Sequence, residues 1–360
     1  MKLFLQLAWR NLWRNKRRTL IACTSIIFAV FLAVAMSAVQ TGQHEFMIDT
    51  AVRYATGHIQ IHGKDYWDKR SLDESMPMDT ALVRYAESLP HVVNVVPRFE
   101  SVALISRGLV TRISPVTGID PVREDAMISL GKRIVQGSSL TSWKSGAIVA
   151  EGLAHRLGIG VGDSVVIYGQ GYHGVTAAAY VPVSALARFS IPDLNNAAVF
   201  LTIAEMQNIF DAPGRLTSIS IVVDRDDNVS DVKGKLQAVA GSGLELMTWK
   251  QMMPELVQAI DADFGGTVIM LSILYVVIGF GIFGTVMMMT TERRREFGMT
   301  IAVGMKRWRL MTMTAIESII LSMLGAAAGI AAAIPVVFYF YRFPIQLTGD
   351  YAKAMLAYGL

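Results

Sequence analysis

The stretch TERRREFGMTIAVGMKRWR, residues 291–309, lies between two long apolar segments. It holds six Arg and Lys residues against two acidic ones, Glu292 and Glu296. The apolar segments are residues 265–291, which carry no charge, and residues 310–341, in which Glu317 is the one charged residue. A helix needs about 20 apolar residues to cross the hydrocarbon of a bilayer. Both segments therefore predict membrane-spanning helices, joined by a short basic loop.

A third apolar segment, residues 20–39, is also free of charge and predicts another span. Of the 360 residues, 17% are charged and 52% are hydrophobic, whereas soluble domains usually carry about 25% charge. This composition excludes a disordered chain and argues against a wholly soluble one. The net charge of +4 is too small to indicate nucleic-acid binding. The start does not resemble a cleavable signal peptide, because the apolar segment is too long.

The distribution of charge predicts the orientation in the membrane. Residues 1–19 hold six basic residues and no acidic one, and the loop at residues 292–309 is also basic. Both are expected in the cytoplasm, because basic loops stay on that side. Residues 40–264 hold 19 basic and 25 acidic residues and are expected outside. After three spans, residues 342–360 would begin an external loop.

The first segment, residues 1–19, has Trp9 and Trp13 four positions apart together with its basic residues. Aromatic and basic side chains at helical spacing are typical of a helix that lies in the headgroup layer of a membrane. We therefore expect an amphipathic helix at the cytoplasmic interface. The alternative is an ordinary basic flank that only sets the orientation.

The external block shows the pattern of an α+β domain over residues 40–250. Short alternating or β-branched segments predict strands, and polar segments with apolar positions at helical spacing predict helices. Residues 251–264 look helical and lead directly into the second span, so we expect a stalk there. The expected strands include residues 57–62, 92–105, 147–149, 164–168, 197–201, 216–223 and 244–247, and the expected helices residues 79–89, 151–157, 203–210 and 229–240.

Several stretches resemble known functional motifs but lack a residue or a secondary-structure element that the motif requires. Residues 169–174, GQGYHG, match the dinucleotide pattern, but a β-like segment follows them, so a glycine-rich hairpin turn is favoured. Residues 224–228 begin like a calcium loop, but Val229 stands where glycine is needed. His58 and His62 share one side of a strand, and we expect a solvated face there rather than a metal site. We therefore expect no catalytic, cofactor-binding or metal-binding residues.

Two features concern the third span. Glu317 lies about two turns inside it and is expected to face protein, headgroups or water rather than lipid. Gly325 and Gly329 form a G-x-x-x-G pattern, in which small residues let two helices approach closely. Packing within the chain and packing in a dimer are both open.

The loop resembles the FtsX-like permease domain of ABC transporters. The resemblance rests on E-R-x-x-E-F-G-x-x-x-A-x-G at residues 292–304, on the basic stretch that follows, and on R-N-L-x-R-x-x-x-R-T-L at residues 10–20. The external block resembles the periplasmic core domain of MacB-type and lipoprotein-releasing, LolC/LolE-like permeases. The matching pieces there are GHIQIH at 57–62, TGIDP at 117–121, EGLA at 151–154, and LG and VGD at 157–158 and 161–163. The lipoprotein-releasing branch looks closest.

The resemblance implies an α-helical transmembrane domain with a large extracytoplasmic α+β domain. That domain would have a split-fold part at about 43–105 and 198–250 and an inserted part at about 106–197. The loop at residues 292–309 would be a coupling segment that contacts the ATPase. By position, its coupling residues are Glu292, Arg293, Glu296, Phe297, Gly298, Ala302, Gly304, Met305 and Arg307.

The implied function is that of a permease subunit in a type VII, mechanotransmission ABC system of the bacterial inner membrane. Its partners would be two ABC ATPase subunits, a second permease copy or a paralogue, membrane lipids and, as one option, a periplasmic lipoprotein carrier. ATP and Mg would bind to the ATPase, because this sequence has no P-loop motif. Release of lipoproteins toward the outer membrane is our leading hypothesis.

Three alternatives stand beside that hypothesis. They are MacB-like export of small amphiphiles or peptides, FtsX-like regulation of a cell-wall hydrolase, and a membrane-anchored enzyme. The enzyme is disfavoured because no catalytic constellation occurs in the sequence. The family also has a fourth span with a cytoplasmic tail, and this sequence stops at Leu360, in what would be the external loop before it. We therefore expect the sequence to be one span short of the family's topology.

Overall fold

The computed structural model describes residues 16–343 together with residues 6, 9, 10 and 13. The chain divides into two compact units, which we describe separately. The helical unit comprises residues up to 45 and from 257 to 346, and the α/β unit comprises residues 46–256. Most of the expected interfacial helix, and residues 344–360 of the expected external loop, lie outside the described residues. Trp9 and Trp13 are both described, and their rings meet edge to face with centroids 6.0 Å apart.

Three helices in the described part of the chain are long and apolar enough to cross a membrane. This confirms the helical prediction for all three apolar segments. From Pro254 onward, the predicted stalk and the second span form one unbroken helix, whereas residues 251 and 252 belong to the short helix before it. The helices are α2 (Lys16–Ala51), α12 (Pro254–Glu292) and α14 (Arg307–Arg342), with the short α13 (Arg294–Ala302) between the last two.

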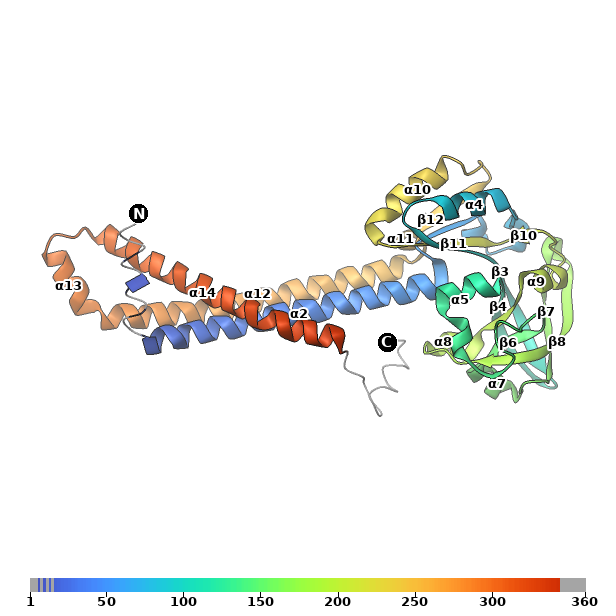
Figure 1. Cartoon of the computed structure of the whole chain (residues 1–360), viewed down its shortest axis with the longest axis horizontal. Helices are drawn as coiled ribbons and strands as arrows, with labels where there is room; N and C mark the ends of the chain where they lie inside the picture. Colours follow the sequence, from blue (N-terminus) through green and yellow to red (C-terminus); the bar gives the residue numbers. More distant parts are fainter. Residues whose placement is uncertain (1–5, 7–8, 11–12, 14–15, 344–360) are drawn as a thin grey trace. The chain divides into compact units, whose positions relative to one another are not determined.

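Glycine allows α14 to pack closely against α2, and Figure 1 shows the two helices together with α12. A Cβ atom built on Gly325 would lie 2.7 Å from Ile26 Cγ2. One built on Gly329 would lie 2.8 Å from the carbonyl oxygen of Ile27. Real Cβ atoms do not come this close, so the two helix backbones can approach only because these positions lack a side chain.

A polar cluster joins α2 to α12 near the ends of these helices. The Nε2 atom of His44 lies 2.7 Å from Oδ2 of Asp263, and Nε2 of Gln40 donates to the same carboxylate at 3.0 Å. Thr267 Oγ1 donates to Gln40 Oε1. Hydrogen bonds to a charged group are stronger than neutral ones, so this cluster fixes the register of the two helices.

The α/β unit is built on one mixed sheet, which has ten strands in the described part of the chain. Its order is β12-β1-β11-β3-β4-β9-β6-β8-β5, and β7 pairs with both β3 and β8. β2 and β10 form a separate two-stranded sheet. The strands are β1 (Ile59–Gly63), β2 (Met76–Pro77), β3 (Val92–Arg107), β4 (Val110–Ile119), β5 (Ile134–Gly137), β6 (Ala147–Ala150), β7 (Ser164–Gln170), β8 (Thr176–Ala187), β9 (Val199–Thr202), β10 (Arg215–Leu216), β11 (Ser218–Val223) and β12 (Leu244–Thr248).

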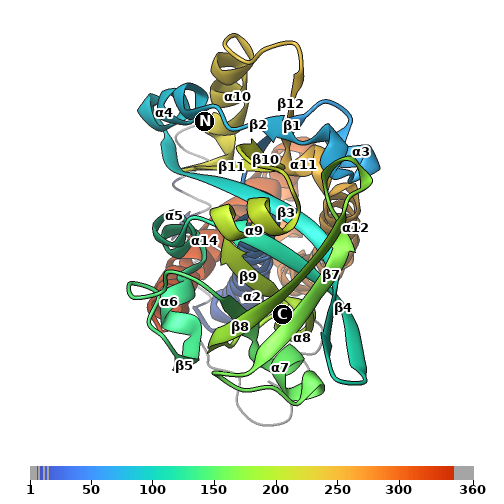
Figure 2. The ribbon, with the colours of Figure 1, turned by 90° about the vertical axis from the view of Figure 1, so that its right-hand side faces the viewer.

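Short helices cover the sheet, as Figure 2 shows. Several begin with side chains that bond the free backbone N–H groups of the first turn, which is the local signal that starts a helix. Asp79 does so for α4, Asp120 for α5, and Thr202 for α9. The helices are α3 (Tyr66–Lys69), α4 (Thr80–Ser88), α5 (Pro121–Ile128), α6 (Leu130–Arg133), α7 (Glu151–Leu157), α8 (Pro192–Ala197), α9 (Ile203–Ile209), α10 (Val229–Gln237) and α11 (Trp249–Met252), with η1 (Val52–Thr56), η2 (Leu72–Glu74), η3 (Tyr172–Gly174) and η4 (Asp226–Asn228) as short irregular turns.

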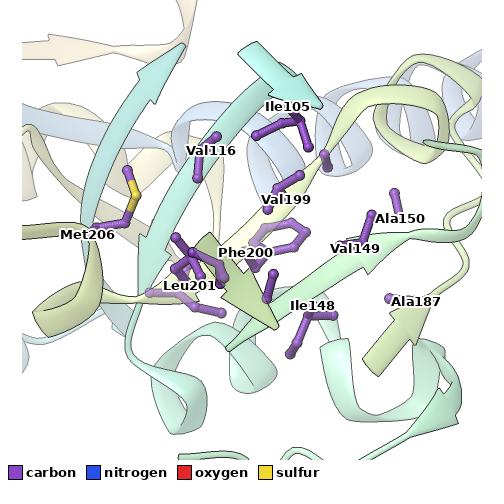
Figure 3. Packing of buried hydrophobic residues seen from close by; sticks show 14 of the residues in the cluster. Ile105, Val116, Ile148, Val149, Ala150, Ala187, Val199, Phe200, Leu201 and Met206 are labelled. Atoms are coloured by element: carbon purple, nitrogen blue, oxygen red, sulfur yellow. The ribbon is translucent and has the colours of Figure 1, made fainter. Parts of the chain in front are cut away.

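Two hydrophobic cores hold this unit together. The smaller core lies around β1, β11, α4 and α10 and includes Ile59, Ile61 and Ile221. The larger one includes Ile148 and Phe200, which Figure 3 shows among other apolar side chains of the cluster. β3 contributes to both cores, because Val95 belongs to the smaller and Phe99, Ala103 and Ile105 to the larger.

Some sequence expectations for this unit need comment. The hairpin turn predicted at residues 169–174 is confirmed, because β7 and β8 pair antiparallel across it. The solvated face predicted for His58 and His62 is wrong. His62 is buried with the rest of β1, and the rings of Tyr66 and Trp67 lie 6.1 Å from its ring between centroids. His58, directly before β1, is half-buried.

Replacing Gly329 by leucine is expected to destabilise the helical unit. The new side chain would collide with α2, and overpacking of this kind typically costs about 1–3 kcal/mol. The matched control is Gly284→Leu on α12, where an added Cβ atom meets nothing within 4 Å. Thermal unfolding of the full chain in detergent should show a lower Tm for Gly329→Leu only. Equal Tm values for both variants would contradict the packing.

The stability of the α/β unit is expected to fall as the pH is lowered from 7 to 5. Burial lowers the pKa of His62 and of His58 below their ordinary value, which is about 6.5. The unfolded chain therefore binds protons at these sites before the folded chain does, and acidification favours unfolding. In thermal unfolding at the two pH values, His62→Gln should lose less Tm on acidification than the wild type.

The control for this measurement is His155→Gln, because His155 is an exposed histidine. It should show the same loss of Tm as the wild type. An unchanged loss in His62→Gln would mean that this histidine does not contribute.

Candidate functional site

The predicted coupling residues lie on one continuous segment, residues 292–309, in the helical unit. This segment starts at the end of α12, runs through α13 and ends at the start of α14. The structure places Glu292 as the last residue of α12, Arg293 between the two helices, Glu296, Phe297, Gly298 and Ala302 on α13, Gly304 and Met305 in the turn that follows, and Arg307 as the first residue of α14.

Arg293 does not face outward with the rest of this segment. Its side chain is buried, at 6% exposure, and its Nη1 donates to Oε2 of Glu317 at 3.1 Å. Glu317 is buried as well, at 5% exposure. The charge inside the third apolar helix thus faces protein, where an opposite charge 24 residues away neutralises it. Such a buried pair is costly to break, because one charge would then remain without its partner.

Gly304 terminates α13 in a way that only glycine does easily. Its φ is +103°, a conformation that side chains with a Cβ atom rarely adopt. The N–H of Gly304 donates to the carbonyl of Ile301 at 2.9 Å, and the N–H of Met305 donates to that of Thr300 at 3.2 Å. These two bonds form the Schellman motif that commonly ends a helix. The structure of this chain therefore requires Gly304.

Gly298 is different, because no contact among the described residues requires it. It lies inside α13, where glycine weakens a helix by about 1 kcal/mol relative to alanine. A Cβ atom added there would meet nothing within 4 Å. A helix normally avoids such a residue unless another molecule must approach its backbone closely.

α13 presents apolar side chains to the outside. All nine of its residues are described, and none of them is buried. Met299 is 64% exposed, and Val303, directly after the helix, is 90% exposed. Arg294 and Arg295 are exposed beside them, and Phe297 is half-buried. The segment thus combines apolar and basic groups on a short surface helix.

The α/β unit contains a second polar feature that the sequence interpretation missed. Arg98 on β3 forms two hydrogen bonds to Glu124 on α5, at 2.6 and 3.1 Å, and both residues are buried. Glu100, two residues along β3, is part of the same cluster, and burial raises the pKa of its carboxyl group. The signal in the sequence is the pair of charged residues Arg98 and Glu100, two positions apart in the largely apolar middle of β3. No group of three or more His, Cys, Asp or Glu residues that could hold a metal occurs among the described residues.

Two family models match the chain. The model described as MacB-like periplasmic core domain matches residues 19–239, and the one described as FtsX-like permease C-terminal matches residues 268–358. Among curated relatives, a macrolide export ATP-binding/permease protein MacB from Burkholderia pseudomallei is 22% identical over 98% of this chain and 55% of its own length. An ABC transporter permease protein from Mycobacterium tuberculosis is 22% identical over 89% of this chain and 36% of its own length.

The chain spans about half or less of the length of these two relatives. Among solved structures, the periplasmic region of MacB from Actinobacillus actinomycetemcomitans matches with a TM-score of 0.39 and 13% identity, over 57% of this chain and 94% of that one. The extracellular domain of the transporter YknZ from Gram-positive bacteria matches with a TM-score of 0.36 and 12% identity, over 53% of this chain and 99% of that one.

The first family model covers more than half of the chain, and the second covers the segment that contains α13 and most of the second and third apolar helices. The chain therefore belongs to the MacB-like periplasmic core domain family and is an ABC transporter permease of the MacB/FtsX type.

Proposed function

We propose that this permease transmits the ATP-driven motion of a separate ATPase through residues 292–309 to its α/β unit. The observation that carries the proposal is the exposure of α13. A helix that buries none of its residues in its own chain, yet presents Met299, Val303 and two arginines, offers a ready surface for a partner.

The length of α13 supports this role. A helix of nine residues is too short to be stable alone in water, because helix formation has a costly first turn. In most proteins, packing against the rest of the fold supplies the missing stability. Among the contacts of the described residues, the Arg293–Glu317 pair and the turn at Gly304 fix the two ends of this helix. Contact with a partner would stabilise the middle.

The partner we propose is an ABC ATPase, present in two copies and serving a pair of permeases. The name of the Burkholderia relative MacB combines ATP-binding and permease functions, and this chain covers 55% of its length. The 360 residues contain no G-x-x-x-x-G-K-[ST] motif. ATP binding would therefore take place outside this segment, and Mg with it.

The cargo we propose is an amphiphilic molecule that the α/β unit engages outside the cytoplasmic membrane. Export of small amphiphiles fits the Burkholderia relative MacB, which is named a macrolide export protein, and release of lipoproteins fits this permease family equally. The two hypotheses differ in what accompanies the native complex. A co-purified lipoprotein would favour release, and a cell-wall hydrolase would favour a regulatory role instead.

The location we propose is the bacterial inner membrane, with residues 292–309 in the cytoplasm and the α/β unit in the periplasm. The three apolar helices and the charge distribution along the sequence support this arrangement.

Substitution of Gly298 is expected to separate coupling from folding. Gly298→Leu adds a side chain where this chain has free space, so the permease should fold and reach the membrane normally. It would block close approach of an ATPase to α13. We expect at least a tenfold loss of ATPase recovered with a tagged permease from native membranes, and a matching loss of ATP hydrolysis by the complex.

Two further variants serve as controls for this experiment. Gly284→Leu, which also adds a side chain in free space but lies outside residues 292–309, should leave ATPase recovery unchanged. Gly304→Leu should lower both stability and recovery, because it forces a side chain into a left-handed backbone conformation at a cost of about 1–2 kcal/mol. Full ATPase recovery and hydrolysis in Gly298→Leu would contradict the coupling role.

Labelling of single cysteines is expected to show the proposed orientation. The one cysteine of the sequence, Cys23, is first replaced by alanine. Leu109→Cys, at the fully exposed turn between β3 and β4, should then react with a membrane-impermeant maleimide added to cells whose outer membrane has been permeabilised. Val303→Cys should react only after the inner membrane is broken. The reverse pattern would refute the orientation and, with it, contact between α13 and a cytoplasmic ATPase.

A further inference from the structure

The sheet of the α/β unit has an unusual polar face. One face of β1 and β11 carries isoleucines that pack in the smaller core. The other carries Gln60 and His62 on β1 and Ser218 and Ser220 on β11, all of them buried. Burying polar groups is unfavourable unless they find partners. A buried face made of such residues therefore calls for an explanation beyond packing.

A cavity of about 460 Å³ opens on this face. Gln60, Arg98 and Glu100 line it from the sheet, and Tyr66 and Trp67 line it from α3. Cavities that hold small molecules usually measure 300–1,000 Å³ and combine apolar walls with a few fixed polar groups. The size and lining of this one match that description.

Gln60 is an incompletely satisfied group in this cavity. Its side chain is only 2% exposed, and its Nε2 lies 3.5 Å from the hydroxyl oxygen of Ser220. Its Oε1 has no hydrogen-bond partner among the described residues. A buried acceptor without a donor is unfavourable, and a ligand that brings an N–H or O–H group would relieve this.

Glu100 is a second hydrogen-bond acceptor in this cavity, and its carboxylate oxygens can accept further hydrogen bonds. The guanidinium of Arg98 is already engaged by Glu124 and by the carbonyl oxygen of Ala55, at 2.9 Å, and it stays 4.0 Å from the carboxylate of Glu100. The hydroxyl of Ser218 donates to Glu100 at 3.3 Å. Burial raises the pKa of Glu100, although Arg98, Arg70 and the hydrogen bond from Ser218 act in the opposite direction. A cation bound nearby would compensate the negative charge of Glu100.

The remaining walls suit an apolar body. Val102, Pro115 and Phe200 line the cavity beside Glu100. At another part of the wall, the guanidinium of Arg70 lies 3.6 Å from the centre of the Trp67 ring. The positive charges of Arg98 and Arg70 both act on Glu100, but burial outweighs them. The positive group of a ligand is therefore assigned to Glu100 and its apolar part to Phe200.

We propose that this cavity binds an amphiphilic primary amine. Its ammonium group would donate to the carboxylate of Glu100 and to Oε1 of Gln60, and its apolar part would lie against Val102, Pro115 and Phe200. The proposal goes beyond the coupling function. It needs no ATPase, so binding to the permease alone tests it separately from the role of α13.

The test uses the full chain in lipid nanodiscs and three water-soluble probes of the same shape: 4-phenylbutylamine, 4-phenylbutanol and 4-phenylbutyrate. Isothermal titration, with empty nanodiscs subtracted, should show saturable binding of the amine and at least tenfold weaker binding of the alcohol. The butyrate should not bind measurably. Quenching or a shift of tryptophan fluorescence on addition of the amine should disappear in Trp67→Phe if the cavity is the site.

Two variants connect binding to the named residues. Glu100→Gln should weaken the amine about tenfold or more and leave the alcohol nearly unchanged, because only a charge-assisted hydrogen bond is lost. Gln60→Met, which has a similar shape, should weaken both probes without lowering the Tm of the free protein, because the acceptor that it removes has no partner there. Asp227→Asn, which removes an exposed carboxylate far along the chain from these residues, is the matched control and should bind the amine as the wild type does.

The proposal is overturned if the butyrate binds as tightly as the amine, or if amine binding is equal in the wild type and in Glu100→Gln. It is also overturned if neither the amine nor the alcohol binds to the wild-type permease. A result in which binding is present and ATPase recovery is unaffected by Gly298→Leu would support the cavity and refute the coupling role.

Discussion

The buried ion pair between Arg293 and Glu317 is the contact on which the arrangement of the helical unit's loop depends. It joins Arg293, the residue after α12, to Glu317 in the third turn of α14, and the two residues are 24 positions apart in the sequence. In an environment of low dielectric, either charge alone would be strongly unfavourable, so the two residues hold each other in place. The pair thereby fixes where α13 starts, while Gly304 fixes where it ends. A short helix that is fixed at both ends is well suited to transmit a push, because force on it passes to the spans through two defined points.

In the α/β unit, β3 has a comparable role. Its 16 residues run through both hydrophobic cores, from Val95 in one to Ile105 in the other. β3 also pairs with β4 over ten residue positions, from Arg98 opposite Ile119 to Arg107 opposite Val110. A displacement of either hydrophobic core therefore moves β3, which also contacts the other core. The cavity beside Arg98 and Glu100 lies along β3, so a bound molecule would contact the element that both cores share.

The sequence predicted some levels of this structure well and others poorly. The three apolar segments are unambiguous, because no soluble element needs 20 or more residues without charge. Short strands such as β7 and β11 were also predicted close to their true positions from alternation and turn residues. The proposed border between split-fold and inserted parts at residues 105 and 106 falls near the end of β3, but the strand itself serves both cores. Alternation along a strand is the same in either core, so the pattern contains no sign of where one core ends.

The burial of β1 could not be predicted for a related reason. His58, Gln60 and His62 alternate with isoleucines, which is the usual pattern of a strand with one face in water. The same pattern arises when the polar face is buried, as it is here, where Gln60 and His62 lie beside Ser220 and Ser218 of the neighbouring strand. Only the long-range pairing of β1 with β11, 160 residues apart in the case of Gln60 and Ser220, distinguishes the two situations.

The two glycines of the loop show how structure sharpens a functional argument. In the sequence, Gly298 and Gly304 have equal weight, because both match the family pattern. The structure separates them, since the backbone at Gly304 has a positive φ that the turn requires, whereas the backbone at Gly298 is helical and would accept any side chain. Gly304 is thus explained by the fold and adds little evidence for a partner. Gly298 costs the helix stability, and none of the described residues packs against it. The case for a docking partner therefore rests on this residue and on the exposed apolar side chains beside it.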